Sequence, residues 1–220
     1  MNSVRVFSVP TNISVVYGED MTLTDQVVYC ARVSNPVSQA KGLNGTKLIE
    51  YLIEHKHWSP FEMVTVVMDI TTTRDIARQL LRHRSFSFQE FSQRYAVQNA
   101  PMHYREARIQ DSNNRQSSLP AEDDFIESRW KSIQRSVEQV TTAYYEEALG
   151  MGIAKEVARA LLPEGMTESR LLVSGSLRSW MHYVEVRTDP STQKEHRDLA
   201  TRCAEALDPF FPYISRFRQT

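Results

Sequence analysis

The chain has 220 residues, of which 41% are hydrophobic and 24% are charged, and this composition is typical of a soluble globular protein. A chain of this length can bury a sizeable core, so we expect a single domain over residues 1–220. Its 26 lysine and arginine residues nearly balance its 27 aspartate and glutamate residues. Without a global positive charge, the chain is not expected to bind nucleic acid in general, and any use of positive charge must be local.

The two cysteines, Cys30 and Cys203, lie far apart in the sequence and belong to no CxxC or Cys/His pattern. They therefore predict neither a disulfide framework nor a zinc site, and we expect no metal and a reducing, cytoplasmic setting. The first residues lack the apolar core of a signal peptide, and no apolar run approaches the roughly 20 residues of a membrane-spanning helix. We therefore expect no membrane partner.

The N-terminal half of the chain predicts strands and helices in alternation. β-branched and apolar residues around Pro10 predict two short strands, over 4–9 and 13–17, and residues 61–70 predict a strand central to a sheet. Apolar residues at helical spacing predict three helices. These run from a cap at Thr22 or Thr24 to Val33, from a cap at Asn44 or Thr46 to about His55, and from a cap among residues 71–73 to Leu81.

The C-terminal half predicts mostly helices, with one strand over 167–174. The helices are expected over residues 121–150, 154–161, 177–186 and 192–207. The first carries an apolar stripe that suits the core or a subunit interface. Ser176 is the expected cap of the third, and Thr192 with Glu195 predicts a capping box for the last.

A polar, irregular stretch over residues 99–119 separates the two halves. A loop of this length in a compact domain is usually functional or disordered, and we expect a mobile cover near the site. Tyr104, Arg105 and Arg108 could meet a ligand there, although solvated surface is the expected place for each one.

The segment from Arg82 to Tyr95 has the composition of a binding site. It holds three arginines, a histidine, a carboxylate and three serines between aromatic residues. Arginine binds phosphate bidentately and keeps its charge when partly buried, so this segment indicates an anion site anchored by Phe86 and Phe88. The alternative is an amphipathic edge strand that carries ordinary salt bridges.

The spacing within this segment resembles the signature of the flavin-dependent thymidylate synthases. Arg82-His83-Arg84 is followed, after seven residues, by Ser92, which Glu90 and Arg94 flank. Two further blocks, residues 158–163 and 176–187, are similar to the same family, and the resemblance spans roughly residues 25–190. It implies an α/β (α+β) fold, a single compact domain in which long helices flank a mixed or antiparallel sheet.

The resemblance implies a dUMP site in which Arg187 polarises the pyrimidine and is the catalytic residue. A neighbouring subunit is expected to contribute Arg159, whose alternative role is to satisfy the last carbonyls of its helix. The residues implied to bind dUMP are Gln79, Arg82, Glu90, Ser92, Gln93, Arg94, Arg159 and Arg187.

The resemblance also implies an FAD site. Its implied residues are Ser34, His57, Ser59, Arg82, His83, Arg84, Glu90, Ser176 and His182. Ser176 and His182 depart from the family, which usually has asparagine at both positions. The alternatives are a turn residue for Ser34 and, for His57, a histidine facing the negative end of a helix dipole.

The implied activity is reductive methylation of dUMP to dTMP. The carbon comes from methylenetetrahydrofolate and the reducing equivalents from NADPH through FAD, in a homotetramer with active sites at subunit interfaces. No base at a recognisable spacing activates Ser92 as a nucleophile, so a phosphate or backbone hydrogen bond is its expected use. Another nucleotide-binding flavoenzyme and a non-catalytic nucleic-acid-binding module are the alternatives.

Overall fold

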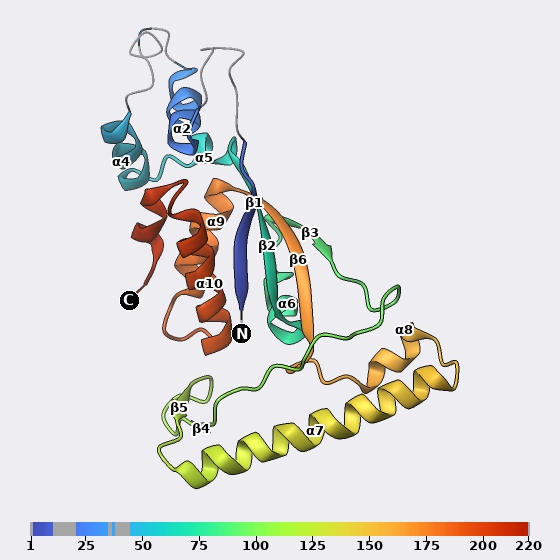
Figure 1. Cartoon of the computed structure of the whole chain (residues 1–220). Helices are drawn as coiled ribbons and strands as arrows, with labels where there is room; N and C mark the ends of the chain where they lie inside the picture. Colours follow the sequence, from blue (N-terminus) through green and yellow to red (C-terminus); the bar gives the residue numbers. More distant parts are fainter. Residues whose placement is uncertain (1, 11–20, 35–36, 38–44, 220) are drawn as a thin grey trace.

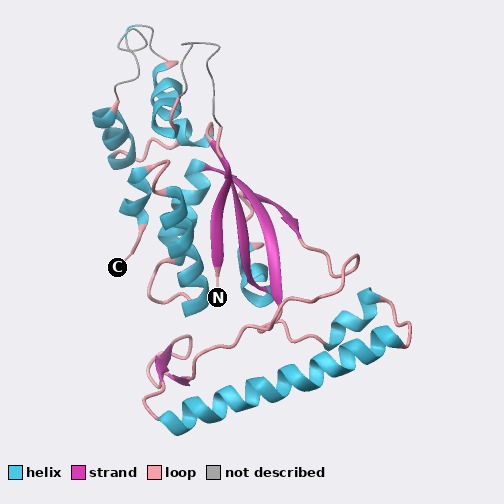
Figure 2. Cartoon of the chain, in the orientation of Figure 1, coloured by secondary structure: helices cyan, strands magenta, loops and turns pink. Residues whose placement is uncertain are grey.

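The computed structural model describes residues 2–10, 21–34, 37 and 45–219. At its centre is a four-stranded antiparallel sheet with the order β1-β2-β6-β3 (Figure 2). The strands are β1 (Ser3–Ser8), β2 (Thr65–Thr73), β3 (Phe86–Glu90) and β6 (Glu168–Ser176). The strand predicted over 13–17 and the cap predicted at Asn44 lie outside the described residues.

Strands β2 and β6 form the middle of the sheet and pair along their whole length, from Thr65 opposite Ser176 to Thr73 opposite Glu168. The alternating side chains Val66, Met68 and Ile70 of β2 are fully buried, as the period of a strand requires. The prediction of a central strand here is confirmed, but its start at residue 61 is wrong. Residues Ser59–Glu62 instead form the short helix α5, with Pro60 in its first turn.

Helices pack against this sheet and against one another (Figure 1). Thr22 forms a capping box with Asp25 at the start of the first of them, so the predicted cap is confirmed. Ser176 likewise caps its helix, since its hydroxyl accepts a hydrogen bond from the N–H of Ser179. The helices are α2 (Leu23–Arg32), α4 (Thr46–Glu54), α6 (Arg74–Leu80), α9 (Leu177–Arg187), α10 (Lys194–Leu207) and the 3₁₀ helix η2 (Pro212–Phe217).

The long helix α7 (Asp124–Gly150) lies across one end of the sheet, apart from the other large helices (Figure 1). The short helix α8 (Lys155–Ala158) and the 3₁₀ helix η1 (Arg159–Leu161) return along its C-terminal end, where Tyr145 and Leu162 belong to a small separate core. The apolar stripe of α7 is left at least 37% exposed. Its residues are Phe125, Ile126, Trp130, Ile133, Val137, Val140 and Tyr144. The stripe is therefore not part of this chain's own core.

Three local predictions were wrong. The 99–119 stretch is not irregular throughout, because β4 (Arg108–Gln110) and β5 (Ser118–Pro120) pair as a hairpin. The helix expected over 154–161 is divided into α8 and η1. The capping box of Thr192 and Glu195 does not form: Gln193 is the N-cap of α10, and the Glu195 carboxylate instead accepts hydrogen bonds from Arg108 and Gln193.

Gly175 determines how the edge strand β3 lies on β6. It is paired with Phe86, and a Cβ at Gly175 would stand 2.2 Å from Cδ1 of that ring. The missing side chain lets the Phe86 ring lie over the sheet and reach Trp180, with 4.4 Å between the ring centroids. Because Phe86 follows directly after residues 82–85, this contact also fixes the turn that precedes β3.

Candidate active site

The turn formed by Arg82, His83 and Arg84, called here the signature turn, follows helix α6. Helix α6 ends at Leu80, and the N–H groups of Arg82 and His83 close the last turn on the carbonyls of Gln79 and Leu80. Arg82 and Arg84 are exposed, and neither side chain makes a hydrogen bond or ion pair within the described part of the chain. Two guanidinium groups are therefore free to bind an anion at this turn.

His83 of the signature turn is joined to the last residue of α9. Nε of Arg187 donates a hydrogen bond of 2.9 Å to Nε2 of His83. Burial, together with the charges of Arg187 and His182, lowers the pKa of His83 to about 4. His83 is thus neutral near pH 7 and carries its proton on Nδ1, because a guanidinium can only donate. The structure places the catalytic candidate Arg187 against the signature turn.

Gln79 lies beside this pair and is held by two residues that the sequence did not predict. Its Nε2 donates to Oε1 of Gln193 at 2.7 Å, and its Oε1 lies 3.1 Å from Nδ1 of the fully buried His196. The rings of His83 and His196 are 6.4 Å apart. Gln79, His83 and Arg187, called here the α6–α9 cluster, thus form one continuous group with the start of α10.

A second group of predicted residues surrounds α8. Arg94 donates from Nε to Glu156 at 3.1 Å, and Nε of Arg159 donates to the carbonyl of the same glutamate at 3.2 Å. The N–H of Arg94 also donates to Oγ of Ser92. Ser92, Gln93, Arg94 and Arg159 are called here the α8 cluster.

Gln93 and Arg159 of the α8 cluster line a cavity of about 350 Å³. The cavity lining includes Arg74, Arg78, Gln93 and Arg159. Gln93 is 2% exposed, and its Nε2 has no hydrogen-bond partner among the residues that the structure describes, so a buried donor is left unpaired at this cavity. An unpaired donor beside arginines fits a phosphate group.

Glu90, assigned from the sequence to both ligands, is fixed by its neighbours in the fold. Oγ of Ser169 donates to its Oε1 at 2.7 Å, and Nη1 of Arg74 lies 3.7 Å from the same oxygen. Ser169 is on the central strand β6 and is 1% exposed. The carboxylate of Glu90 is therefore held in place by residues that the motif does not include.

The candidate FAD residues come from four separate parts of the chain, near positions 34, 57–59, 82–90 and 176–182. Oγ of Ser176 donates to Oε2 of Glu62 at 2.5 Å, which joins the start of α9 to helix α5. Beside this contact, the guanidinium of Arg178 lies 4.7 Å from the ring centroid of Trp58. Glu62 was not among the residues predicted from the sequence, although it lies three positions after the predicted Ser59.

The remaining FAD candidates are exposed around this region. The N–H of His57 donates to the carbonyl of Leu52, so His57 closes the C-terminal end of α4 while its side chain faces outward. Ser59 begins α5, Ser34 lies just past α2, and His182 is on α9. Their side chains are accessible to a ligand.

The two groups of candidate dUMP residues are held by different helices, one by α6 and α9 and the other by α8 and η1. No hydrogen bond or ion pair among residues 2–10, 21–34, 37 and 45–219 joins the α6–α9 cluster to the α8 cluster. In Figure 1, α8 lies beside α7 beyond one end of the sheet, whereas α9 and α10 lie alongside the sheet. Each cluster thus offers only part of the residues that a nucleotide site would need.

Two negative observations apply to the described residues. None of their helices is both long and apolar enough to cross a membrane. No group of three or more His, Cys, Asp or Glu side chains among them is arranged to hold a metal ion.

The free arginines of the signature turn and the arginine-lined cavity beside α8 suit an enzyme that acts on an anionic substrate. A family model described as thymidylate synthase complementing protein matches residues 19–213, and the chain belongs to this family. A flavin-dependent thymidylate synthase of Synechocystis sp. is 47% identical over 215 residues, with 96% of this chain and 97% of the relative covered. A probable flavin-dependent thymidylate synthase of Paramecium bursaria Chlorella virus 1 is 44% identical, with 89% and 90% covered.

Solved structures have the same fold. The UMP/dUMP methylase PolB from Streptomyces cacaoi, bound with 5-Br dUMP, superposes with a TM-score of 0.81 at 25% sequence identity. The superposition covers 99% of this chain and 94% of that chain. The predicted fold, with helices flanking an antiparallel sheet, is confirmed.

Proposed function

We propose that this protein is a flavin-dependent thymidylate synthase that methylates dUMP to dTMP. In this proposal methylenetetrahydrofolate supplies the carbon, and NADPH supplies reducing equivalents through bound FAD. The observation that carries the proposal is the hydrogen bond between Arg187 and His83, which places a permanent cation beside the two free arginines of the signature turn. The names of the relatives at 44% and 47% identity support the same activity.

The residues around the signature turn fit FAD. When bound, FAD supplies the transfer of reducing equivalents from the nicotinamide to the substrate. Arg82 and Arg84 are free to hold its diphosphate, and neutral His83 has an Nδ1–H to donate. The paired side chains of Ser176 and Glu62 offer further polar atoms near the accessible candidates. We assign Ser34, His57, Ser59 and His182 to the same site.

Arg187 is proposed to stabilise negative charge on the uracil ring. Its Nε is taken by His83, and its terminal nitrogens make no other hydrogen bond or ion pair within the described part of the chain. Donors fixed in advance at the place where charge develops usually contribute the largest share of rate enhancement. The contact with His83 orients the guanidinium before substrate binds.

The nucleotide phosphate is proposed to bind at the α8 cluster of a neighbouring subunit. Arg159 and the unpaired amide of Gln93 line the cavity there and supply its donors, and Arg94, which is ion-paired with Glu156 of the cavity wall, supplies a further one. The separation of this cluster from the α6–α9 cluster is the reason for requiring a second copy. The exposed apolar stripe of α7 offers a surface for assembly, and we propose a homotetramer.

Visible spectroscopy tests this function. Purified protein should show flavin absorption, and added dUMP should shift the flavin bands, because substrate and FAD share one site. UMP is the matched control, since it differs only at the 2′ position. Formation of dTMP should require the folate, NADPH and dUMP together. Protein that binds no flavin, even after FAD is added, would contradict the proposal.

A further inference from the structure

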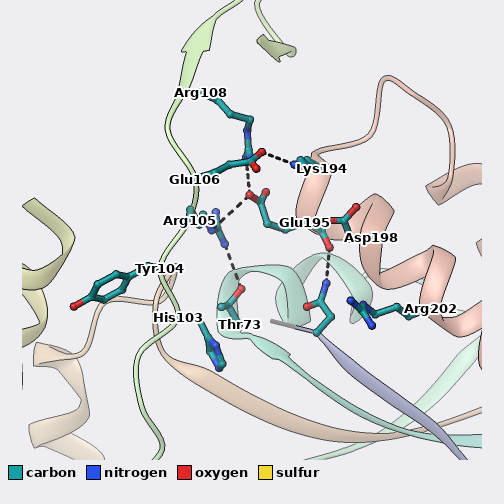
Figure 3. Close-up of a pocket in the computed structure, with 11 residues that line it drawn as sticks. Thr73, His103, Tyr104, Arg105, Glu106, Arg108, Lys194, Glu195, Asp198 and Arg202 are labelled. Atoms are coloured by element: carbon teal, nitrogen blue, oxygen red, sulfur yellow. Dashed lines mark hydrogen bonds and ion pairs between the residues drawn. The ribbon is translucent and has the colours of Figure 1, made fainter. Parts of the chain in front are cut away.

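Gln79 is the end of a chain of hydrogen bonds that begins at a charged residue. Glu195, in the first turn of α10, accepts a hydrogen bond of 2.6 Å from Nη2 of Arg108 and lies 4.0 Å from Nε of Arg105 (Figure 3). Burial raises the pKa of Glu195, but hydrogen bonds from Arg108 and Gln193 outweigh it and leave the pKa below its usual value. The carboxylate is therefore ionised near pH 7 and can only accept hydrogen bonds.

This charge determines the direction of each hydrogen bond that follows. Gln193 must turn its Nε2 toward the carboxylate of Glu195, at 2.9 Å. Its Oε1 is then the atom that faces Gln79, so Gln79 must present Nε2 at 2.7 Å. The Oε1 of Gln79 must consequently accept from Nδ1–H of His196. An amide by itself could adopt either of two orientations, but here only one satisfies the whole chain.

His196 has the protonation that this direction requires. The residue is fully buried, and burial, with the charges of Arg187 and His83, lowers its pKa to about 3. A neutral imidazole has one proton, and the hydrogen bond to Gln79 places it on Nδ1. Nε2 is then an acceptor only, and this buried atom has no hydrogen-bond partner within the described part of the chain.

We propose that Gln193 and His196 are positioning residues that orient the amide of Gln79 for the pyrimidine. Of the two hydrogens on Nε2 of Gln79, one is donated to Gln193, and the other remains for a carbonyl oxygen of uracil. If the amide were reversed, Gln79 would present its own oxygen and repel that carbonyl. This inference rests on the proposed function, because it takes Gln79 to be part of the dUMP site.

The first test replaces the donor of His196. His196→Phe keeps a buried ring but has no N–H, so the Kd for dUMP should rise about threefold to tenfold. His196→Asn provides an amide N–H near the position of Nδ1 and should restore most of the affinity. In a Gln79→Ala background, His196→Phe should have no further effect on the Kd, since the residue acts through Gln79.

The second test removes the negative charge of Glu195, which determines how the amides of Gln193 and Gln79 are oriented. Glu195→Gln should also weaken dUMP binding severalfold, because Gln193 is then free to reverse. Glu106→Gln is the matched control: Glu106 also pairs with Arg108, at 3.1 Å, and with Lys194, at 2.5 Å (Figure 3). Among the described residues, the side-chain hydrogen bonds of Gln193 go to Gln79 and Glu195 and not to Glu106. The control should keep the wild-type Kd to within about twofold.

The possible results separate this inference from the proposed function. Wild-type protein that binds FAD but not dUMP would overturn the function itself. Wild-type binding that His196→Phe leaves unchanged, or an equal loss in the Gln79→Ala background, would overturn the positioning role alone. Equal effects of Glu195→Gln and Glu106→Gln would also overturn it. Thermal unfolding of each variant, with its flavin content, identifies any loss that comes from misfolding.

Discussion

Arg187 and His83 are 104 positions apart in the sequence, yet the guanidinium of one donates to the imidazole of the other at 2.9 Å. The pair leaves Arg187 with its two terminal nitrogens available and leaves His83 with its proton on Nδ1. An imidazolium at this position would turn a hydrogen bond into a repulsion between two cations. The contact therefore depends on the low pKa of His83, which burial produces first and the nearby charges second.

Substitution of Arg187 should reduce turnover without reducing flavin binding. Arg187→Ala should abolish dTMP formation while FAD stays bound, because no residue of the signature turn is changed. Arg187→Lys keeps the charge but loses the planar fork, and its turnover should fall by about 10²-fold to 10³-fold. Single-turnover dTMP formation and the flavin-to-protein ratio check both expectations. Normal turnover of the alanine variant would remove the polarising role.

Ser92→Ala should weaken dUMP binding but leave some activity. Oγ of Ser92 accepts from the N–H of Arg94 at 3.3 Å, and no histidine or lysine in the described part of the chain forms a hydrogen bond with it. The hydroxyl thus helps to shape the α8 cluster. Equilibrium binding of dUMP and steady-state rates measure the effect, with the exposed Ser87→Ala as control. Complete loss of activity at unchanged dUMP affinity would instead indicate a nucleophile.

Gly175→Ala should destabilise the protein by about 1–3 kcal/mol, the usual cost of overpacking a core. The new Cβ would stand 2.2 Å from Phe86, whose ring cannot move without losing its contact with Trp180. Gly165→Ala is the matched control, because a Cβ there meets no atom of the described residues within 4 Å. Urea unfolding of the two variants gives the comparison. Equal stabilities would show that the ring accommodates the methyl group.

Acidification should reduce the free energy of unfolding through His196. Its pKa is about 3 in the folded chain and about 6.5 when exposed. Below about pH 6.5 the unfolded chain binds a proton that the folded chain does not, so stability falls as the pH drops toward 3. The maximal slope is about 1.4 kcal/mol per pH unit for one such group.

Urea unfolding between about pH 7 and pH 5 measures this slope while most carboxylates remain ionised. His196→Phe should unfold with a shallower pH dependence than the wild type. His83 contributes in the same direction down to about pH 4, so the variant should retain part of the dependence. If the free energy of unfolding changed with pH equally in the two proteins, the prediction that His196 is buried and neutral would be wrong.

The stripe on α7 should control assembly. Ile133→Glu and Val140→Glu each place a charge in the exposed apolar row, and the assembly should dissociate because an unpaired charge cannot be buried cheaply. Gln139→Glu adds the same charge on an exposed polar position of α7. Light scattering coupled to size exclusion measures the mass of each variant. A wild-type monomer would contradict assembly through α7.

The sequence pattern was sufficient to predict a helix cap where residues close in sequence determine it. The caps at Thr22 and Ser176 were predicted correctly because the hydroxyl and the N–H it satisfies are three residues apart. Thr192 and Glu195 carry the same local signal, yet the prediction was wrong. Glu195 is ion-paired with Arg108, which lies 87 positions away. Arg108 thus competes with the helix N-terminus for the Glu195 carboxylate, and a pattern of neighbouring residues cannot predict this.

Long-range contacts also decide which parts of the site sequence reasoning could find. Arg105 and Arg108 were expected on solvated surface, but their side chains are only 22% and 15% exposed and form ion pairs with Asp75 and Glu195. Gln193 and His196 belong to no motif block. Their importance comes only from the packing of α10 beside α6, so nothing in the sequence marks them except their position shortly after Arg187.

Gly175 also bears on the alignment of β3. That strand has only five residues and lies at the edge of the sheet, so few backbone pairs oppose a slip along β6. A shift by one residue would set Ser85 or Ser87 opposite Gly175 and turn Phe86 to the other face of the sheet. The space left by the absent side chain of Gly175 therefore fixes the register of β3 on β6. It thereby also fixes the angle at which His83 meets Arg187.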